Sequence, residues 1–352
     1  PAAERGNMNF SIKSAAAGFA FATAVTASAA SAQDTIDLKI SHAFPTTHYL
    51  IENGLDVWVA SLKEELGDRI NFTIYPAQQL GKAAEALDLA ASGVADVVLT
   101  ATSYHPTQLT VTGVAELPGM FSDICVASRA SMALSKEGEF FDTADFEPNE
   151  VQAIYNVSLP IYKVVTADRK VETMDDLKGL KLRTTGAAME LTARELGAVG
   201  VRMPSPELFQ AAQRGTVDGA LYLYAGMPPY DLQSVFKHST EGVSMGSTHL
   251  VLLMNREKFN DLPEDIQETF LRLGAAAAEN NCAWMTDNET VERDRMVEES
   301  GLEVTTLADD EAARWRELTA AVAGDWASSA GEDGAKAVET YRAAVESAAA
   351  QN

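Results

Sequence analysis

The first third of the chain alternates between two spacings of apolar residues. Apolar and polar side chains alternate in some segments, as in half-buried strands, and over 50–66 large apolar residues recur every three to five positions, as in an amphipathic helix. Pro45 and Gly67 end the first strand and the first helix of this pattern. The predicted strands are 34–44, 69–76 and 95–102, and the predicted helices are 50–66 and 82–93. This order favours right-handed crossovers and a largely parallel sheet, and hence an α/β fold.

The second half repeats the alternation. Thr173 and Asp176 have the spacing of a helix capping box. The helix predicted over 263–299 extends roughly 55 Å at about 1.5 Å per residue, long enough to pack along two domains. The predicted strands are 179–185, 217–224 and 247–255, and the other predicted helices are 186–198, 201–215 and an Ala-rich stretch that starts at residue 309.

One segment of the first half aligns without gaps on a segment of the second half. Residues 87–102 match 209–224, with identities at Ala90/Ala212, Gly93/Gly215, Asp96/Asp218 and Leu99/Leu221. In both segments a helix ends at a glycine, and an Asp precedes a buried strand. Open α/β sheets bind ligands at the carboxyl ends of their strands. The match therefore suggests two similar α/β units that face each other across a hinge and form a cleft.

Composition and charge narrow the class of protein. The chain has 352 residues, 46% hydrophobic and 22% charged, with 51 Asp and Glu against 27 Lys and Arg, a formal net charge of −24. This length and composition fit two globular domains and exclude disorder as the main state. A surface this acidic repels phosphate groups, which argues against partners such as nucleic acid or anionic lipid.

The first 32 residues have the pattern of a secretory signal peptide. Lys13 precedes an Ala-rich apolar run over 15–25, and Ala-Ser-Ala at 30–32 forms an A-x-A cleavage signal. Residues 1–7 precede Met8 and are interpreted as an upstream remnant. No other stretch approaches 18 apolar residues, and the residue directly after the cleavage signal is not a Cys. The sequence therefore predicts an exported, periplasmic protein without a direct membrane anchor.

Motifs that carry chemistry are sparse. The sequence has no P-loop, G-x-G-x-x-G, H-E-x-x-H, G-x-S-x-G or C-x-x-C motif, and S-x-x-K at 234–237 is short enough to arise by chance. His42 and His48 share a loop, but no third metal ligand lies near them in the sequence. We therefore expect no enzyme, no cofactor and no metal. Cys125 and Cys282 are expected to be separate thiols, with a disulfide as the alternative in an oxidising compartment.

Six motifs, taken in order, resemble those of the DctP-like solute-binding proteins of tripartite ATP-independent periplasmic (TRAP) transporters. They are SHAFPTTH at 41–48, EALDLAASGVAD at 85–96, VAELPGMF at 114–121, MDDLKGLKLR at 174–183, ELFQAAQRGTVDG at 207–219 and LPEDIQ at 262–267. The resemblance covers nearly the whole mature chain. It implies the two-domain periplasmic binding protein fold, with a ligand cleft between domains and a long helix spanning both.

On this resemblance, the expected domain boundaries follow the crossing strands. Residues 33–158 with about 247–285 would form domain I, and residues 159–246 with about 286–352 would form domain II with the C-terminal helices. The family also implies closure of the two domains over a small organic anion.

Arg183 is the residue at which the resemblance and the sequence pattern agree. It lies near the end of a predicted strand, on the opposite face from Leu182 and Thr184, and its planar guanidinium suits a bidentate bond to a carboxylate. In the family, the matching Arg holds the carboxylate of the substrate. Dicarboxylate binders of the family have polar residues at two other positions. One of these positions matches Tyr222 here, and the other falls near Tyr162. These replacements argue against a C4-dicarboxylate.

Several aromatic residues fall at predicted strand ends or in the adjoining loops, where an aromatic-lined pocket can form. We therefore predict a monocarboxylate ligand with an aromatic or other apolar body, such as benzoate or hydroxybenzoate. A C4-dicarboxylate or a 2-oxo or 2-hydroxy acid is the alternative. His48, Thr102 and Thr185 are predicted to bind a ligand hydroxyl. The full set of predicted ligand-binding residues is Arg183, Tyr222, Tyr162, Tyr104, Phe44, His48, Thr102, Thr185 and Tyr224.

The predicted mechanism is capture without chemistry. Domain closure over the bound acid would present it to the membrane permease subunits of a TRAP transporter. An exported hydrolase with a Ser or His in the same cleft is the alternative of another class. A binding protein that passes its ligand to a signalling receptor is a third possibility with the same fold.

Overall fold

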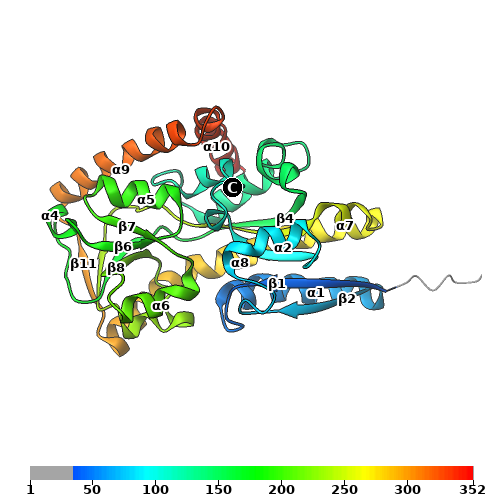
Figure 1. Ribbon diagram of the computed structural model, residues 1–352, viewed down its shortest axis with the longest axis horizontal. Helices are drawn as coiled ribbons and strands as arrows, with labels where there is room; N and C mark the ends of the chain where they lie inside the picture. Colours follow the sequence, from blue (N-terminus) through cyan, green and yellow to red (C-terminus); the bar gives the residue numbers. More distant parts are fainter. Residues whose placement is uncertain (1–34, 352) are drawn as a thin grey trace, which may run out of the picture. The chain divides into compact units, whose positions relative to one another are not determined.

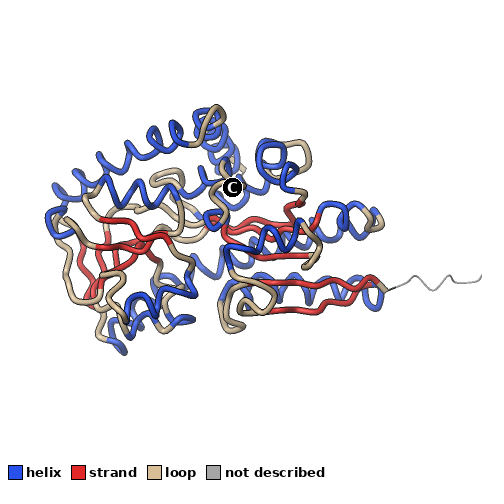
Figure 2. The backbone as a smooth tube through the Cα atoms, viewed as in Figure 1, coloured by secondary structure: helices blue, strands red, loops and turns tan. Residues whose placement is uncertain are grey.

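The computed structural model describes residues 35–351, so the signal peptide predicted for residues 1–32 lies outside the described residues. In this part of the chain the strands form a five-stranded sheet and a six-stranded sheet, and helices pack around both (Figures 1 and 2). The predicted α/β class is therefore confirmed. No helix within residues 35–351 is both long and apolar enough to cross a membrane.

The first sheet has the strand order β2-β1-β3-β10-β4. Strands β1, β2 and β3 are parallel, as predicted, whereas β10 runs antiparallel to both of its neighbours. The antiparallel pairing arises because the chain leaves this sheet through β4 and returns directly through β10. The strands are β1 (Ile36–His42), β2 (Ile70–Tyr75), β3 (Val97–Ala101), β4 (Val151–Ser158) and β10 (His249–Asn255). The accompanying helices are α1 (Asp56–Leu66), α2 (Ala86–Ala91), α3 (Ile124–Leu134), α7 (Arg256–Asn260) and α10 (Gly334–Ala349), the last packed on α3.

The second sheet has the strand order β11-β9-β5-β8-β6-β7. Strand β6 is parallel to β7 and β8, and β5 is antiparallel to β8 and β9. The strands are β5 (Lys163–Thr166), β6 (Lys181–Thr184), β7 (Val199–Arg202), β8 (Gly219–Tyr222), β9 (His238–Glu241) and β11 (Glu303–Thr306). The accompanying helices are α4 (Met174–Leu177), α5 (Ala187–Glu195), α6 (Ser205–Gln213) and α9 (Asp309–Ser329), which packs on α5 (Figure 1).

The two α/β units close the crossover that leads to β3 and the crossover that leads to β8 in the same way, as the internal sequence match predicts. In the first unit, the backbone N–H of Lys39 donates to the carboxylate of Asp96 at 2.6 Å, and in the second unit Lys181 donates to Asp218 at 2.8 Å. The glycine before each Asp has a positive φ, 71° at Gly93 and 68° at Gly215. The match therefore reflects a repeated structural unit. In each unit the Asp that precedes a strand is hydrogen-bonded to the parallel strand beside it, β1 for Asp96 and β6 for Asp218.

Two extended segments cross between the sheets side by side, one after β4 and one before β10. Leu159 N donates to Thr248 O at 3.0 Å, and Tyr162 N donates to Gly246 O at 2.8 Å. Gly246 has a φ of 94°, and a Cβ at this position would lie 2.5 Å from the carbonyl oxygen of Glu116. Both constraints require glycine here, and they fix the path of the crossing segments.

Helix α8 (Glu264–Ser300) contacts elements of both sheets, and its 37 residues confirm the long helix predicted over 263–299. On the first side, Trp58 Nε1 donates to Phe270 O at 3.1 Å. On the second side, the carboxylate of Glu289 accepts the backbone N–H groups of Tyr224 and Ala225, each at 2.9 Å, and pairs with the ammonium group of Lys163. The helix therefore holds the loop that follows β8 by its backbone.

A disulfide joins Cys125 of α3 to Cys282 of α8, with their Cα atoms 5.3 Å apart. The expectation of two separate thiols is therefore wrong. The pairing depends on how α3 packs against α8, and 157 residues separate the two cysteines in the sequence. The bond attaches the long helix to the first sheet's side of the molecule.

The double variant Cys125→Ser/Cys282→Ser should unfold at lower denaturant concentration than the oxidised wild type. A cross-link that closes so long a loop contributes about 2–5 kcal/mol to the free energy of unfolding. Urea titration measures this loss of unfolding free energy. Wild type whose disulfide has been reduced should lose about as much. Two reactive thiols in the native, unreduced protein would contradict the assignment.

The carboxyl group of Glu116 is buried beside the crossing segments. It accepts hydrogen bonds from Thr102 Oγ1 at 3.3 Å and from the backbone N–H of His249 at 3.1 Å. Burial raises its pKa from 4.5 to about 7, although these hydrogen bonds partly oppose the shift. Because the folded chain holds the proton more tightly than the unfolded chain, the protonated group stabilises the fold at low pH, and this contribution is lost as the pH rises through about 7.

The variant Glu116→Gln should therefore lose less thermal stability than wild type when the pH rises from about 5 to about 8.5. Glutamine keeps an oxygen to accept both hydrogen bonds and does not ionise. Melting temperatures of both proteins across this range give the difference, in which the contributions of the shared buried histidines cancel. Parallel melting curves for the two proteins would show that Glu116 does not titrate in this range.

Candidate ligand-binding site

A small cavity lies between the carboxyl-terminal ends of strands from both sheets. Its volume is about 20 Å³, which is roughly the room for one water molecule. Side chains from the loop after β1, the end of β3, the crossing segments, the end of β8 and the start of α6 line it. The aromatic rings that line it are Phe44, His48, Tyr49, Tyr104, Tyr162 and Tyr222, and its other lining residues are Leu50, Ala101, Leu159, Ser205, Leu223, Gly226, Thr248 and Leu250.

The guanidinium group of Arg183 lies directly behind this lining. Arg183 is completely buried, its Nη2 donates to the hydroxyl of Ser205 at 3.0 Å, and its guanidinium carbon lies 5.3 Å from the centre of the Tyr222 ring. Its Nε donates to the carbonyl oxygen of Met203 at 3.0 Å. Its Nη1 has no partner, and no carboxylate of residues 35–351 lies within 4.0 Å. A buried cation without a counter-ion is costly, so this position favours an anion.

Strand β6 and the start of α6 place these groups together. Leu182 and Thr184 alternate with Arg183 along β6, as the sequence pattern predicts. The chain then returns along β7, and Ser205 begins α6 next to the guanidinium. Because the first N–H groups of a helix have no partner within it, the N–H of Ser205 bonds to a group outside α6.

Tyr104 connects the first sheet to this helix start. It follows β3, and its hydroxyl oxygen accepts the backbone N–H of Ser205 at 3.1 Å and lies 3.4 Å from the Ser205 hydroxyl. Since Ser205 also accepts from Arg183, the three residues form one hydrogen-bonded chain from the first sheet to the second. This chain spans the cleft and is intact in the structure.

Tyr162, Tyr222 and His48 are neutral at pH 7. The Tyr162 and Tyr222 rings pack with their centres 5.8 Å apart, and burial raises the pKa of Tyr222 to about 12 and the pKa of Tyr162 further, although Arg183 opposes both shifts. Burial lowers the pKa of His48 to about 3. His48 Nδ1 accepts the N–H of Leu50 at 3.2 Å, so the single proton of its neutral ring lies on Nε2. These rings can donate hydrogen bonds without repelling an anion.

Besides Arg183, which lies behind the lining, three of the predicted ligand-binding residues do not line the cavity. The hydroxyl of Thr102 bonds to Glu116 and the His249 carbonyl. The hydroxyl of Thr185 bonds to Met189 and lies behind Thr248, which donates to it at 3.4 Å. Tyr224 turns away, because its hydroxyl bonds to Ser239 at 2.7 Å and to Glu241 at 2.8 Å. The structure therefore brings Phe44, His48, Tyr104, Tyr162 and Tyr222 around Arg183, and leaves Thr102, Thr185 and Tyr224 outside this group.

Sequence reasoning missed several lining residues. Tyr49 lies at the start of a predicted helix, where helical spacing assigns an aromatic residue to the core. Ser205 precedes Pro206, a sequence signal for a helix start that could have marked it. Thr248 lies near the start of the strand predicted over 247–255, and nothing in the sequence distinguishes it from the residues that follow.

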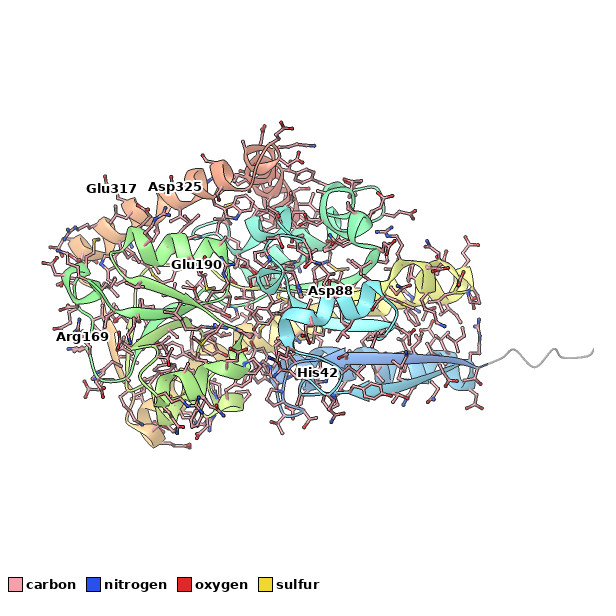
Figure 3. The ribbon with its side chains drawn as sticks, in the orientation of Figure 1. His42, Asp88, Arg169, Glu190, Glu317 and Asp325 are labelled. Carbon is pink, nitrogen blue, oxygen red and sulfur yellow. A yellow bond between two sulfur atoms is a disulfide. The ribbon has the colours of Figure 1, made fainter. Side chains whose placement is uncertain are left out.

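The acidic surface does not extend into the cavity. Glu317 and Asp325 project outward from α9, and Asp88 lies on the outer side of α2 (Figure 3). Glu289, which shifts the pKa of Tyr49, is neutralised by its ion pair with Lys163. At physiological ionic strength, exposed charges are screened beyond about 8 Å.

Two larger surface cavities within residues 35–351 are lined by arginines that are paired with carboxylates. One of about 530 Å³ is lined by Arg272, which pairs with Glu65. Another of about 480 Å³ is lined by Arg194, which pairs with Glu195 and Asp325. The site beside Arg183 is therefore the stronger candidate for binding an organic anion, despite its small volume.

Two solved structures share the fold over almost their whole length. A TRAP solute-binding protein from Rhodoferax ferrireducens T118, solved with copurified benzoate, is 24% identical with a TM-score of 0.82, and the match covers 90% of this chain and 99% of that one. A marine metagenome TRAP solute-binding protein specific for aromatic acid ligands, solved with 3-hydroxybenzoate, is 23% identical with a TM-score of 0.81, and the match covers 89% of this chain and 98% of that one. The predicted two-domain binding protein fold is thereby confirmed.

Sequence comparison gives the same family. The C4-dicarboxylate-binding periplasmic protein DctP of Rhodobacter capsulatus is 25% identical over 295 residues, which are 80% of this chain and 85% of that protein. A family model described as bacterial extracellular solute-binding protein, family 7, matches residues 40–329. The chain therefore belongs to bacterial extracellular solute-binding protein family 7, the DctP-like solute-binding proteins of TRAP transporters.

Proposed function

We propose that this protein captures an aromatic monocarboxylate in the periplasm and delivers it to the membrane permease of its TRAP transporter. The observation that carries the proposal is the completely buried, unpaired guanidinium of Arg183 behind a cavity lined with aromatic rings. The guanidinium provides the carboxylate anchor, and the rings provide the surface for an apolar body. The benzoate and 3-hydroxybenzoate bound by two structural relatives support this ligand class.

The charge of the cavity favours one carboxylate over two. No Lys or Arg is among the described residues that line the cavity, and Arg183 is the cation in contact with its wall. The second carboxylate of a C4-dicarboxylate would face aromatic rings and neutral hydroxyl groups, at a large desolvation cost. The C4-dicarboxylate named for the Rhodobacter capsulatus relative remains the alternative for this chain.

The small volume of the cavity couples binding to domain motion. A benzoate ring cannot fit in a space with room for about one water molecule, so the cleft must open before the ligand enters. Opening separates Tyr104 from Ser205, and closing remakes this contact around the ligand. A ligand that bridges both domains stabilises the closed form, because only that form offers all of its contacts. The permease would then recognise the closed form.

Replacement of Arg183 should remove ligand binding. We expect Arg183→Ala to weaken benzoate binding by at least about 100-fold, because the carboxylate would then be buried without its cation. Arg183→Lys should also bind weakly, since an ammonium group cannot form the two parallel bonds. Isothermal titration calorimetry with benzoate measures both losses.

Two further variants serve as controls for Arg183. Arg183→Met keeps the volume without a buried charge, and its melting temperature should equal or exceed that of wild type. Arg169→Ala removes an exposed arginine near the second sheet (Figure 3) and should leave benzoate binding unchanged. If Arg183→Ala bound benzoate within threefold of wild type, the site would be wrong. If wild type bound succinate or malate and no aromatic acid, the ligand class would be wrong.

Removal of the cross-cleft hydrogen bond should weaken closure. Tyr104→Phe keeps the ring and loses the oxygen that accepts the Ser205 N–H. One such hydrogen bond contributes about 0.5–1.5 kcal/mol, so we expect the affinity for benzoate to fall about 2- to 10-fold. Small-angle X-ray scattering should also show a smaller ligand-induced compaction at equal benzoate concentration. Tyr75→Phe on β2 is the matched control, and an equal loss in that variant would rule out a specific role for Tyr104.

A further inference from the structure

The hydroxyl group of Tyr49 lines the ligand cavity and has no hydrogen-bond partner among residues 35–351. The residue is 3% exposed, so the bulk solvent does not reach it. A phenylalanine would fill the same space with the same ring and would leave no polar atom buried. An unpaired buried hydroxyl is costly, and because Tyr49 lines the cavity, a group of the bound ligand can supply the missing partner.

The Tyr49 ring is held in place from two sides. It stacks on Trp284 of α8, with ring centres 5.2 Å apart and an angle of 11° between the planes. It also packs against the His48 ring, with ring centres 4.5 Å apart. A ring fixed in this way presents its hydroxyl in one position before any ligand arrives. Preorganisation of this kind strengthens discrimination, because little conformational freedom is lost on binding.

Tyr49 is not part of the carboxylate anchor. Arg183 contacts Tyr222 and Ser205, and it acts on the pKa values of Tyr162, Tyr222 and Tyr230. The pKa of Tyr49 is raised by burial and by the neighbouring tyrosines and Glu289, so the hydroxyl stays protonated and can both donate and accept. The cavity therefore has a cationic position at Arg183 and a separate neutral polar position at Tyr49.

The residues expected from the sequence to bind a ligand hydroxyl leave this role open. Thr102 and Thr185 use their hydroxyl groups within the protein and do not line the cavity. His48 does line it, next to Tyr49 in the chain, and offers the proton of Nε2. A ligand hydroxyl at this end of the cavity would therefore meet a neutral donor in His48 and a donor and acceptor in Tyr49.

We propose that Tyr49 is a specificity-determining residue that binds a hydroxyl substituent of the ligand, so that the preferred class is hydroxylated aromatic monocarboxylates. This inference rests on the proposed function, since it assumes an aromatic acid anchored on Arg183. A site built to bind a hydroxyl discriminates against the analogue that lacks it, because the polar group of the site is then left unpaired. Benzoate has no hydroxyl substituent and would leave the Tyr49 hydroxyl without a partner.

The test is calorimetric titration of wild type and Tyr49→Phe with benzoate, the 2-, 3- and 4-hydroxybenzoates and the matching methylbenzoates. Wild type should bind its best hydroxybenzoate at least about 10-fold more tightly than benzoate, and no methylbenzoate should show this gain. In Tyr49→Phe this preference should fall to about 1, while the affinity for benzoate changes less than about threefold. Tyr49→Phe keeps the ring that stacks on Trp284, and its melting temperature verifies the fold.

The matched control is Tyr155→Phe. Tyr155 is another buried tyrosine whose hydroxyl has no partner among the described residues, but it does not line the cavity, so the preference should stay as in wild type. The inference is overturned if wild type does not prefer a hydroxybenzoate, or if Tyr49→Phe keeps the preference. It is also overturned if Tyr49→Phe has an equally reduced affinity for all of the acids. In each of these cases, Arg183-dependent binding of benzoate would leave the proposed function standing. The absence of binding to any aromatic acid would instead overturn the proposed function.

Discussion

The burial of the Arg183 guanidinium without a carboxylate partner is the constraint on which the rest of the binding site depends. A cation in the interior must be hydrogen-bonded, and here the Met203 carbonyl and the Ser205 hydroxyl each accept from it. Ser205 can do so because α6 begins there, and Tyr104 completes the same chain from the first sheet. The cation thus organises groups from both sheets and leaves one nitrogen for an anion.

The acidity of the chain and the proposed binding of an anion are compatible because the surface charge and the charge of Arg183 act over different ranges. A net charge of −24 is spread over an exterior where water and salt screen it. The guanidinium lies in a low-dielectric interior, and the tyrosines and His48 around it are neutral. The nearby carboxylate of Glu289 is paired with Lys163. The field that a bound carboxylate experiences is therefore that of Arg183.

Local signals were sufficient to predict much of the fold and the strand on which Arg183 lies. The helix over 263–299 and the alternation around Arg183 depend on neighbours in the sequence, and both are found in the structure. The Cys125–Cys282 bond depends on helix packing across 157 residues, which no local pattern contains. Tyr222 and Tyr224 follow the same alternation, but β8 ends at Tyr222 and the chain turns, so that only Tyr222 lines the cavity.

The anchors of α8 determine where domain motion and ligand recognition meet. Cys282 ties the helix to the first sheet's side, and Glu289 ties it to the loop after β8 on the second side. These residues are two helical turns apart, roughly 10 Å. The proposed closure of the domains would therefore load this short piece of helix and the bonds of Glu289. Trp284 lies between the two anchors and stacks on Tyr49, so the segment that must respond to closure also sets the orientation of a ring in the cavity wall.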